Sequence, residues 1–444
     1  METATLLSKE YALQACLKIK SDQTNFLHFN REKPYGKNHD TIPLYHNFLY
    51  ILSLLRSHQV DYMQEGMRIL THLLYFQNQG MFPNYIHNFP FVRQSPLQVD
   101  ILAPIMIIYR DYGHLFSDEL SNRLKLALID ILEACRQIPV LDTHSELKVN
   151  LFAYAYGILF DSEALFPLKS WNEIKVLGSH QLSDLLIFAQ LLLKTPMEKE
   201  IKKILNLCEK SYHFATRNFS GIQSYELWNG ASAKQTLFHH VMNLRHGLQL
   251  DEKSDNLMFL SLVDFASLPA VELNSQGDSF FNHMTKVSDC ENPLQTIFNY
   301  SFATEKDFFH LTSYVGEFEF SSKMIEEGKL EAQFKITKEF DPQLCREPII
   351  KLFISQPEKV KVLVEGKCAT TFQANENVSL MMREEEVGLL FHSNNDQSHF
   401  LGKVCRSNRP AQVNATKFDA YDLEVAIRSV KWEVGDIITL MIQV

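Results

Sequence analysis

The chain has 444 residues, 45% of them hydrophobic, which is long enough for two or three domains with cores of their own. Its formal net charge of −10 argues against a protein that coats nucleic acid, because phosphate binding draws on clustered Lys and Arg. Only 16 residues are Gly, so tight turns are few and long helices are favoured.

The N-terminus, METATLLSKEYALQACLKIK, has acids and polar residues where a secretory signal peptide needs an apolar run. No segment reaches the roughly 18 uncharged apolar residues of a membrane span. We therefore expect a soluble, cytoplasmic protein without membrane insertion, and export without a Sec-type signal stays open. The seven cysteines are scattered and lack a Cys-x-x-Cys spacing, which predicts reduced thiols rather than disulfides or a zinc site.

A helical period governs the chain from about residue 40 to about residue 270. Apolar residues at i, i+3, i+4 and i+7 predict helices near residues 42–55 and 63–74. Residues 96–113 and 148–160 are apolar nearly all round, so these helices should be covered on all sides. Residues 121–137 are amphipathic instead. This alternation of buried and exposed helices predicts helical hairpins arranged in two concentric layers.

After about residue 295 the period changes to two. Alternating apolar residues predict strands in residues 331–340, 359–366 and 421–430, and residues 436–444 form an apolar strand. Short strands at close spacing indicate an antiparallel β-sandwich. Residues 272–293 between the two parts are polar and loop-like. We therefore expect a helical domain over residues 1–285 and a β-sandwich domain over residues 286–444.

One local motif begins in the stretch GMFPNYIHNFP. It consists of a Gly-x-x-Pro-Asn turn, a short loop and a Val-Asp pair that opens an apolar helix, here Gly80, Pro83, Asn84, Val99 and Asp100. This motif is similar to one of the six-hairpin glycosidases, which include the neutral and alkaline invertases. The aromatic residue that usually follows the Asp is absent, since residues 101–104 read ILAP.

The order of the two parts carries a second resemblance. A helical-hairpin (α/α) toroid followed by a β-sandwich resembles the polysaccharide lyases of the heparinase II/III and chondroitin lyase type. Both resemblances imply a carbohydrate-active protein with an (α/α) toroid. They differ in chemistry, because the local motif favours a glycoside hydrolase and the domain order favours a lyase.

Two stretches hold the candidate site residues. In a toroid of hairpins, loops at one end of the inner helices surround a central cavity, so residues far apart in sequence can meet there. Polar groups mixed with aromatic rings suit a carbohydrate ligand, because sugar C–H faces stack on rings while hydroxyls need directional partners. The first stretch contributes Asn84, Tyr85, His87, Arg93 and Asp100, and the second contributes Tyr225, Glu226, Trp228, Asn229 and His239.

The two chemistries use these residues differently. A β-eliminating lyase needs a base for the C5 proton of a uronate, for which Tyr85 or Tyr225 would serve. It also needs donors that neutralise the uronate carboxylate, here Asn84, His87 and Asn229. A glycoside hydrolase needs two carboxyl groups, which would be Asp100 as the acid and Glu226. Among the remaining residues, those expected to bind substrate are Arg93, Trp228 and His239.

Several alternatives stay open. Asp100 could instead sit in the first turn of a helix, where a carboxylate favours the helix dipole. The adjacent His239 and His240 point about 100° apart on a helix, and no HExxH spacing is present, so we expect no metal. No Gly-rich phosphate loop is present either, so we expect no cofactor. The chain could also be a non-catalytic scaffold or effector that binds glycan or protein.

Overall fold

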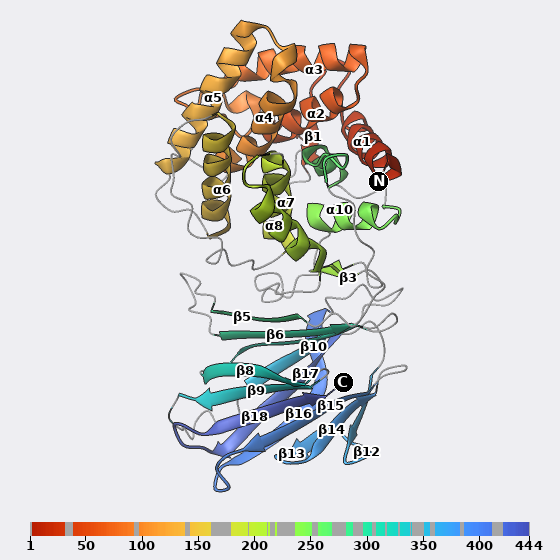
Figure 1. Cartoon of the computed structure of the whole chain (residues 1–444), viewed down its shortest axis with the longest axis vertical. Coiled ribbons are helices and arrows are strands. Elements are labelled where there is room, and N and C mark those ends of the chain that lie inside the picture. The colour runs from red at the N-terminus through yellow and green to blue at the C-terminus, as the bar shows by residue number, and fades with distance from the viewer. Residues whose placement is uncertain are drawn as a thin grey trace. The chain divides into compact units, whose positions relative to one another are not determined.

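The structure is a computed structural model that describes most of the chain. The described residues are 2–31, 39–92, 97–137, 143–160, 179–193, 195–210, 212–213, 218–219, 236–250, 256–268, 281–286, 296–303, 308–315, 318–326, 329–337, 339, 350–355, 360–381, 386–410 and 421–443. The chain divides into two compact units (Figure 1), of which the first is helical and covers residues 1–175, 179–209 and 235–271. The second contains the large β-sheets and covers residues 176–178, 210–234 and 272–444.

The helical part runs from red to green in Figure 1. Its α-helices are α1 Glu2–Leu17, α2 Leu44–Arg56, α3 Val60–Leu73, α4 Leu97–Tyr112, α5 Asp118–Arg136, α6 Thr143–Leu159, α7 Ser179–Leu192, α8 Glu198–Lys210 and α10 Leu237–Arg245. Its 3₁₀ turns are η1 Leu74–Phe76, η2 Ile86–Asn88, η3 Gly113–Leu115 and η5 Leu257–Leu262. Two short antiparallel strand pairs are also present: β1 Phe29–Arg31 pairs with β2 His39–Thr41 in this unit, and β3 Tyr212–His213 pairs with β4 Asn218–Phe219 in the second unit.

Buried and partly exposed helices alternate along the first part of this unit. Helices α2 and α4 are buried over most of their length, because apolar residues occupy all their faces. Helix α3 between them buries only the stripe Gly66, Ile69, Leu70 and Leu73. The predicted alternation is therefore confirmed here. No helix in the described part of the chain is both long and apolar enough to cross a membrane.

The contacts between the buried helical elements follow a cyclic order. Helix α2 contacts α4, α4 contacts α6, α6 contacts α7 and α7 contacts α10. The 3₁₀ turn η5 contacts both α10 and α2, and so closes the cycle. Helices α3 and α5 pack against α2 and α4 respectively. The buried elements thus form a closed chain of neighbours, with amphipathic helices packed against two of them.

The second unit contains two sheets, each with seven strands among the described residues and with antiparallel pairing throughout. One sheet has the order β13-β16-β17-β10-β7-β6-β5, and the other has the order β12-β11-β14-β15-β18-β9-β8. The strands are β5 Phe281–Lys286, β6 Thr296–Ala303, β7 Phe308–Val315, β8 Phe318–Glu326, β9 Lys329–Ile336, β10 Ile350–Ser355, β11 Lys361–Val364, β12 Lys367–Cys368, β13 Thr371–Gln373, β14 Asn377–Met381, β15 Glu386–Ser393, β16 His399–Pro410, β17 Tyr421–Lys431 and β18 Ile437–Gln443.

Both sheets contribute to one hydrophobic core. Leu330, Ala332 and Phe334 alternate along β9 and face inward from one sheet. Leu352 in β10 and Val425 in β17 reach the same core from the other sheet. Two antiparallel sheets with a shared core form a β-sandwich, which the period of two predicted.

The division between the units lies earlier in the chain than expected. The expected boundary between residues 285 and 286 falls inside β5, which pairs with β6 over residues 281–286. The second unit already begins again at residue 272. The sequence of β5, FNHMTK, lacks a clear apolar alternation, so it gave no strand signal of its own.

Candidate functional site

Charged and phenolic side chains gather at the N-terminal ends of buried helices. The four concerned lie within the first two turns of α2, α4, α6 and α7, and they are Tyr45, Asp100, Lys148 and Asp184. Helix α10 begins at the same end of α7, because the Phe238 N–H donates to Ser183 Oγ at 3.0 Å. Helix N-termini carry partial positive charge, so this end of the bundle suits anionic groups.

Lys148 joins three of these helices. Its Nζ lies 2.7 Å from Asp100 Oδ1 and 3.1 Å from Asp184 Oδ1. The side chains of Lys148 and Asp184 are 12% and 7% exposed, whereas that of Asp100 is 37% exposed. We call Asp100, Lys148 and Asp184 the ion-pair cluster. It extends from the buried interior to the surface, where Asp100 is in contact with solvent.

The electrostatics of the ion-pair cluster follow from its burial. Burial alone would lower the pKa of the Lys148 ammonium, but Asp184 and Asp100 together outweigh it, so the pKa lies above its ordinary value. Burial, followed by the charge of Asp100, raises the pKa of the neighbouring Tyr45. Lys148 therefore stays charged and Tyr45 stays a neutral phenol at neutral pH.

The loop before α4 is held in place by its neighbours. The Phe82 N–H donates to Gln98 Oε1 at 2.9 Å, and Gln98 Nε2 donates to the Phe82 carbonyl at 2.7 Å. The Leu44 N–H, at the start of α2, donates to the Asn84 carbonyl at 3.1 Å. The Ile86 N–H donates to the carbonyl of Ile42 at 3.0 Å. The loop is thus fixed to the N-terminal ends of both α2 and α4.

Three predicted site residues lie close together on this loop. The rings of Tyr85 and His87 stack with centroids 5.5 Å apart and an interplanar angle of 11°. The Tyr85 side chain is half-buried, and those of Asn84 and His87 are exposed. Because the Asn84 carbonyl binds the residue next to Tyr45, this group shares the N-terminal end of α2 with the ion-pair cluster.

Asp100 lies in the first turn of α4, where its carboxylate also complements the helix dipole. Its Oδ1 accepts the hydrogen bond from Lys148 Nζ. A carboxylate in this contact serves as an acceptor, whereas a general acid must hold a proton that it can give to the leaving group. The surroundings of Asp100 therefore fit a structural or orienting role better than the acid role implied by the glycosidase motif.

His239 lies in the first turn of α10 and is only 2% exposed. Its Nδ1 accepts a hydrogen bond from the backbone N–H of Thr236 at 3.0 Å, which completes a capping box. Burial, followed by the nearby His240 and His180, lowers the pKa of His239 to about 3. His239 is thus a neutral ring that caps α10, and contact with substrate remains a prediction.

The other predicted site residues lie outside the described residues. These are Arg93 on the first stretch, and Tyr225, Glu226, Trp228 and Asn229 on the second. Of the ten residues expected at the site, the structure therefore brings together Asn84, Tyr85 and His87 on one loop, with Asp100 at the start of the following helix.

Sequence reasoning missed Tyr45, Lys148 and Asp184. A signal was present for the two charged residues, because each interrupts a helix that is otherwise mostly apolar. A charged group in such a helix needs a partner when it is buried, and Lys148 and Asp184 supply one to each other.

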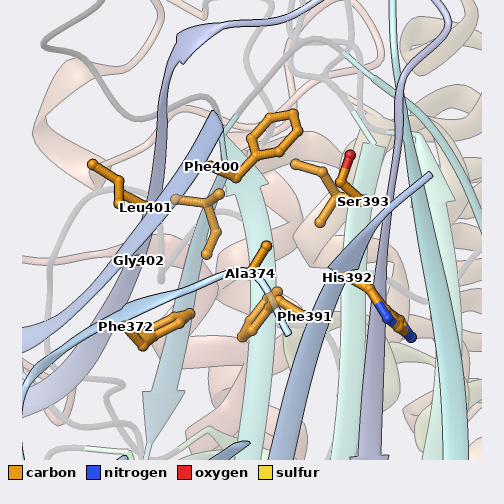
Figure 2. Close-up of a pocket in the computed structure, with 10 residues that line it drawn as sticks. Phe372, Ala374, Phe391, His392, Ser393, Phe400, Leu401 and Gly402 are labelled. Carbon is orange, nitrogen blue, oxygen red and sulfur yellow. The ribbon is translucent and has the colours of Figure 1, made fainter. Parts of the chain in front are cut away.

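Two other kinds of site in the described part of the chain would be a metal centre and a pocket in the β-sandwich. No three His, Cys, Asp or Glu side chains of the described residues gather where they could hold a metal ion. A pocket in the β-sandwich is lined by residues that include Phe372, Phe391 and Phe400 (Figure 2). Its free volume is about 10 Å³, which holds roughly one water molecule and no sugar ring.

Comparison with known proteins gives two weak structural likenesses that can be described. No family model and no curated protein matches the sequence. The chain is similar to the crystal structure of heparinase III, with a TM-score of 0.37 and 9% identity over 99% of this chain and 85% of that chain. It is also similar to a heparan sulfate lyase HepC mutant from Pedobacter heparinus, with a TM-score of 0.23 and 10% identity over 98% and 82% of the two chains. Likeness at this level transfers no residue and no activity, so function is argued from the side chains of this chain.

Proposed function

We propose that the chain is a carbohydrate-active enzyme that cleaves a uronate-containing polysaccharide by β-elimination. The observation that carries the proposal is the stacked pair Tyr85 and His87, next to Asn84, on a loop fixed to two helix N-termini. A phenol, an imidazole and an amide in one short loop are the groups that this reaction needs. Their attachment to rigid helices gives them a defined geometry.

In the proposed reaction Tyr85 is the base. Its Oη takes the proton from C5 of the uronate, and the electron pair forms the C4–C5 double bond while the C4–O bond breaks. The Tyr85 phenol formed in this way gives the proton to the leaving oxygen, which departs as a hydroxyl, and Tyr85 is returned to the deprotonated form that began the reaction. His87 and Asn84 donate hydrogen bonds to the uronate carboxylate and so stabilise the charge that develops when the proton is removed.

We also propose that the helical unit is an (α/α) toroid with the site at the N-terminal ends of its inner helices. The cyclic order of contacts from α2 through α4, α6, α7, α10 and η5 supports a closed ring. The partial positive charge of several helix N-termini at one end would favour an acidic sugar there.

Two alternatives remain distinct from this proposal. A glycoside hydrolase would use Asp100 and Glu226, but Asp100 accepts its hydrogen bond from Lys148 and is ill placed to act as the acid. A non-catalytic scaffold or effector would bind glycan or protein through the same surfaces without cleaving it.

The test is a panel of uronate polymers, in which the unsaturated product is followed by its absorbance. We expect product from at least one polymer. The Tyr85→Phe variant should form it at a rate at least about 100-fold lower than the wild type. His87→Gln should also slow the reaction. Matched controls are Tyr62→Phe, a half-buried tyrosine in α3, and His114→Gln, an exposed histidine in η3, which should both keep the wild-type rate.

Each contrary outcome points to one alternative. Reducing sugar released from neutral glycans, with no absorbing product from any uronate polymer, would replace the lyase by the hydrolase. Binding of glycan or protein without any cleavage would replace it by the scaffold. An active Tyr85→Phe variant would remove Tyr85 from the role of base.

A further inference from the structure

A second surface on the helical unit has unusual composition. Three aromatic side chains are exposed, Tyr75 by 62%, Phe89 by 42% and Phe91 by 80%. Among the residues whose side-chain burial the structure describes, no other Phe, Tyr or Trp is exposed. Surface aromatic rings that gather in one place commonly mark a binding surface, whereas scattered apolar residues need no explanation.

Contacts bring the segments that carry these rings together. The Phe76 and Phe89 rings meet edge to face with centroids 5.6 Å apart. Asn78 Nδ2 donates to the Pro90 carbonyl at 2.8 Å, which ties the segment after η1 to the loop. The Arg123 guanidinium in α5 lies 4.0 Å from the centroid of the Tyr75 ring. We call Tyr75, Phe89, Phe91 and Arg123 the aromatic patch.

The chemistry of the aromatic patch fits an acidic sugar chain. Flat rings offer faces on which the C–H groups of sugars stack. A guanidinium presents a planar fork that matches a carboxylate or a sulfate group. The cation–π contact with Tyr75 orients this fork beside the rings.

We propose that the aromatic patch is a binding surface for an acidic polysaccharide, separate from the reacting groups. The inference rests on the proposed function for the class of polymer. It goes beyond that function because no reacting group lies in the patch. The loop that ends at Phe91 also carries Tyr85 and His87, so one segment links the two surfaces. A polymer held on the patch would stay near the site after each cleavage.

The test is native electrophoresis of the full chain in gels that contain alginate, polygalacturonate or heparin, with dextran as the neutral polymer. We expect at least one acidic polymer to retard the wild type, and dextran not to. Phe91→Ala and Tyr75→Ala should each weaken the apparent affinity about fivefold to tenfold. Arg123→Gln should reduce the retardation mainly at low salt, since exposed charges are screened at high salt.

Two exposed residues elsewhere provide matched controls. Val60→Ala removes an exposed apolar side chain at the start of α3, and Lys202→Gln removes an exposed cation in α8. Both should behave like the wild type. Equal retardation of wild type and all three patch variants in every gel would overturn the inference. A wild type that sediments as a dimer, together with a monomeric Phe91→Ala variant, would instead assign the patch to a second copy of the chain.

The inference and the proposed function fail in different ways. If Tyr85→Phe abolishes product while Phe91→Ala leaves retardation unchanged, the patch is wrong and the lyase stands. If no polymer yields unsaturated product while Phe91→Ala still weakens retardation, the lyase is wrong and the patch stands as a polysaccharide-binding surface.

Discussion

At the scale of single residues, Gly80 is constrained by both its backbone and a neighbouring helix. Its φ angle is +75°, in the left-handed region that other residues rarely adopt. A Cβ atom there would lie 3.0 Å from the carbonyl oxygen of Asp130 in α5. The glycine of the local motif therefore serves the packing of the loop against α5, whatever chemistry the loop performs.

Gly80→Ala should therefore destabilise the helical unit. We expect the free energy of unfolding to fall by about 1–3 kcal/mol, because the side chain adds both backbone strain and a close contact. Urea unfolding followed by the helical circular dichroism signal measures this change. Gly113→Ala is the matched control, since a Cβ there meets nothing closer than the Tyr109 ring at 3.8 Å. Equal effects of the two substitutions would show that Gly80 is not constrained in this way.

Single residues also show what the sequence could reveal about the site. Asn84, Tyr85 and His87 were predicted because polar and aromatic side chains are dense in one short loop. Lys148 was missed because its importance depends on Asp100 and Asp184, which are 48 and 36 positions away in the chain. A pairwise contact across three helices follows from tertiary packing, which no local pattern encodes.

At the scale of elements, the ion-pair cluster connects α4, α6 and α7. Lys148→Met would remove the ammonium and leave Asp184, whose side chain is 7% exposed, without its counter-charge. Removal of one partner from a buried pair leaves an uncompensated charge, so we expect a loss of about 3 kcal/mol in the free energy of unfolding. Chemical denaturation checks the value.

The control for this prediction is an exposed ion pair. Lys202 pairs with Glu198 one turn away in α8, and both side chains are about half exposed or more. Lys202→Met should therefore change stability by less than about 1 kcal/mol. If Lys148→Met is as stable as Lys202→Met, the cluster does not hold the three helices together.

In the β-sandwich, Gly402 in β16 leaves room for an aromatic ring. A Cβ at this position would overlap the Phe372 ring of the neighbouring strand β13. That ring stacks on Phe391 with centroids 5.4 Å apart, and all three residues line the small pocket in Figure 2. The glycine is thus required by the close approach of a side chain, since only hydrogen fits beneath the ring.

Gly402→Ala should destabilise the sandwich by about 1–3 kcal/mol, because the added methyl group forces the ring out of place. Thermal unfolding followed by the β-sheet circular dichroism signal measures the effect. Combination with Phe372→Leu should recover part of the loss, since the smaller side chain vacates the space. Gly388→Ala in β15 is the control, as its Cβ would make only an ordinary contact of 3.7 Å with the Gln443 carbonyl. No recovery in the double variant would argue against the overlap as the cause.

The strands were more predictable than their pairing. Alternation located β9, β17 and β18 within a few residues, because one face of each strand is buried. Assignment of each strand to a sheet was not possible, since β9 pairs with β18, which is about a hundred residues away. Such pairs depend on long-range packing and not on the local period.

At the scale of the whole molecule, the order of a helical part and a β part was predicted, because the period of the apolar residues changes once along the chain. The alternation of buried and exposed helices predicted hairpins in two layers, but not the order in which the buried helices contact one another, since no single helix encodes which neighbour it will meet. Each unit has its own buried core, so each should respond to pH through its own buried titratable groups.

The helical unit should weaken in mild acid. Burial lowers the pKa of His239 to about 3 and that of His240 to about 4, below the ordinary value of 6.5. Below about pH 6.5 the unfolded chain therefore binds protons at these two histidines that the folded unit does not bind. Above pH 6.5 both rings are neutral in the folded and unfolded states, so they do not lower the free energy of unfolding. Below pH 6.5 this free energy falls progressively as the pH approaches 4 and then 3. His240→Asn should flatten this dependence.

The β-sandwich should respond only at lower pH. Burial would raise the pKa of Asp436, but hydrogen bonds from Ser398, the Glu433 N–H and Asn395 outweigh it, so the pKa lies below its ordinary value of 3.8. The contribution of Asp436 is thus present above pH 3.8 and is lost as the pH falls through the lower folded-state pKa.

Urea unfolding at pH 7, 5 and 4, with helical and β signals recorded separately, should show loss in the helical unit first. A β signal that weakens before the helical one would contradict this order, and Asp436→Asn, which should leave the helical profile unchanged, identifies the unit responsible.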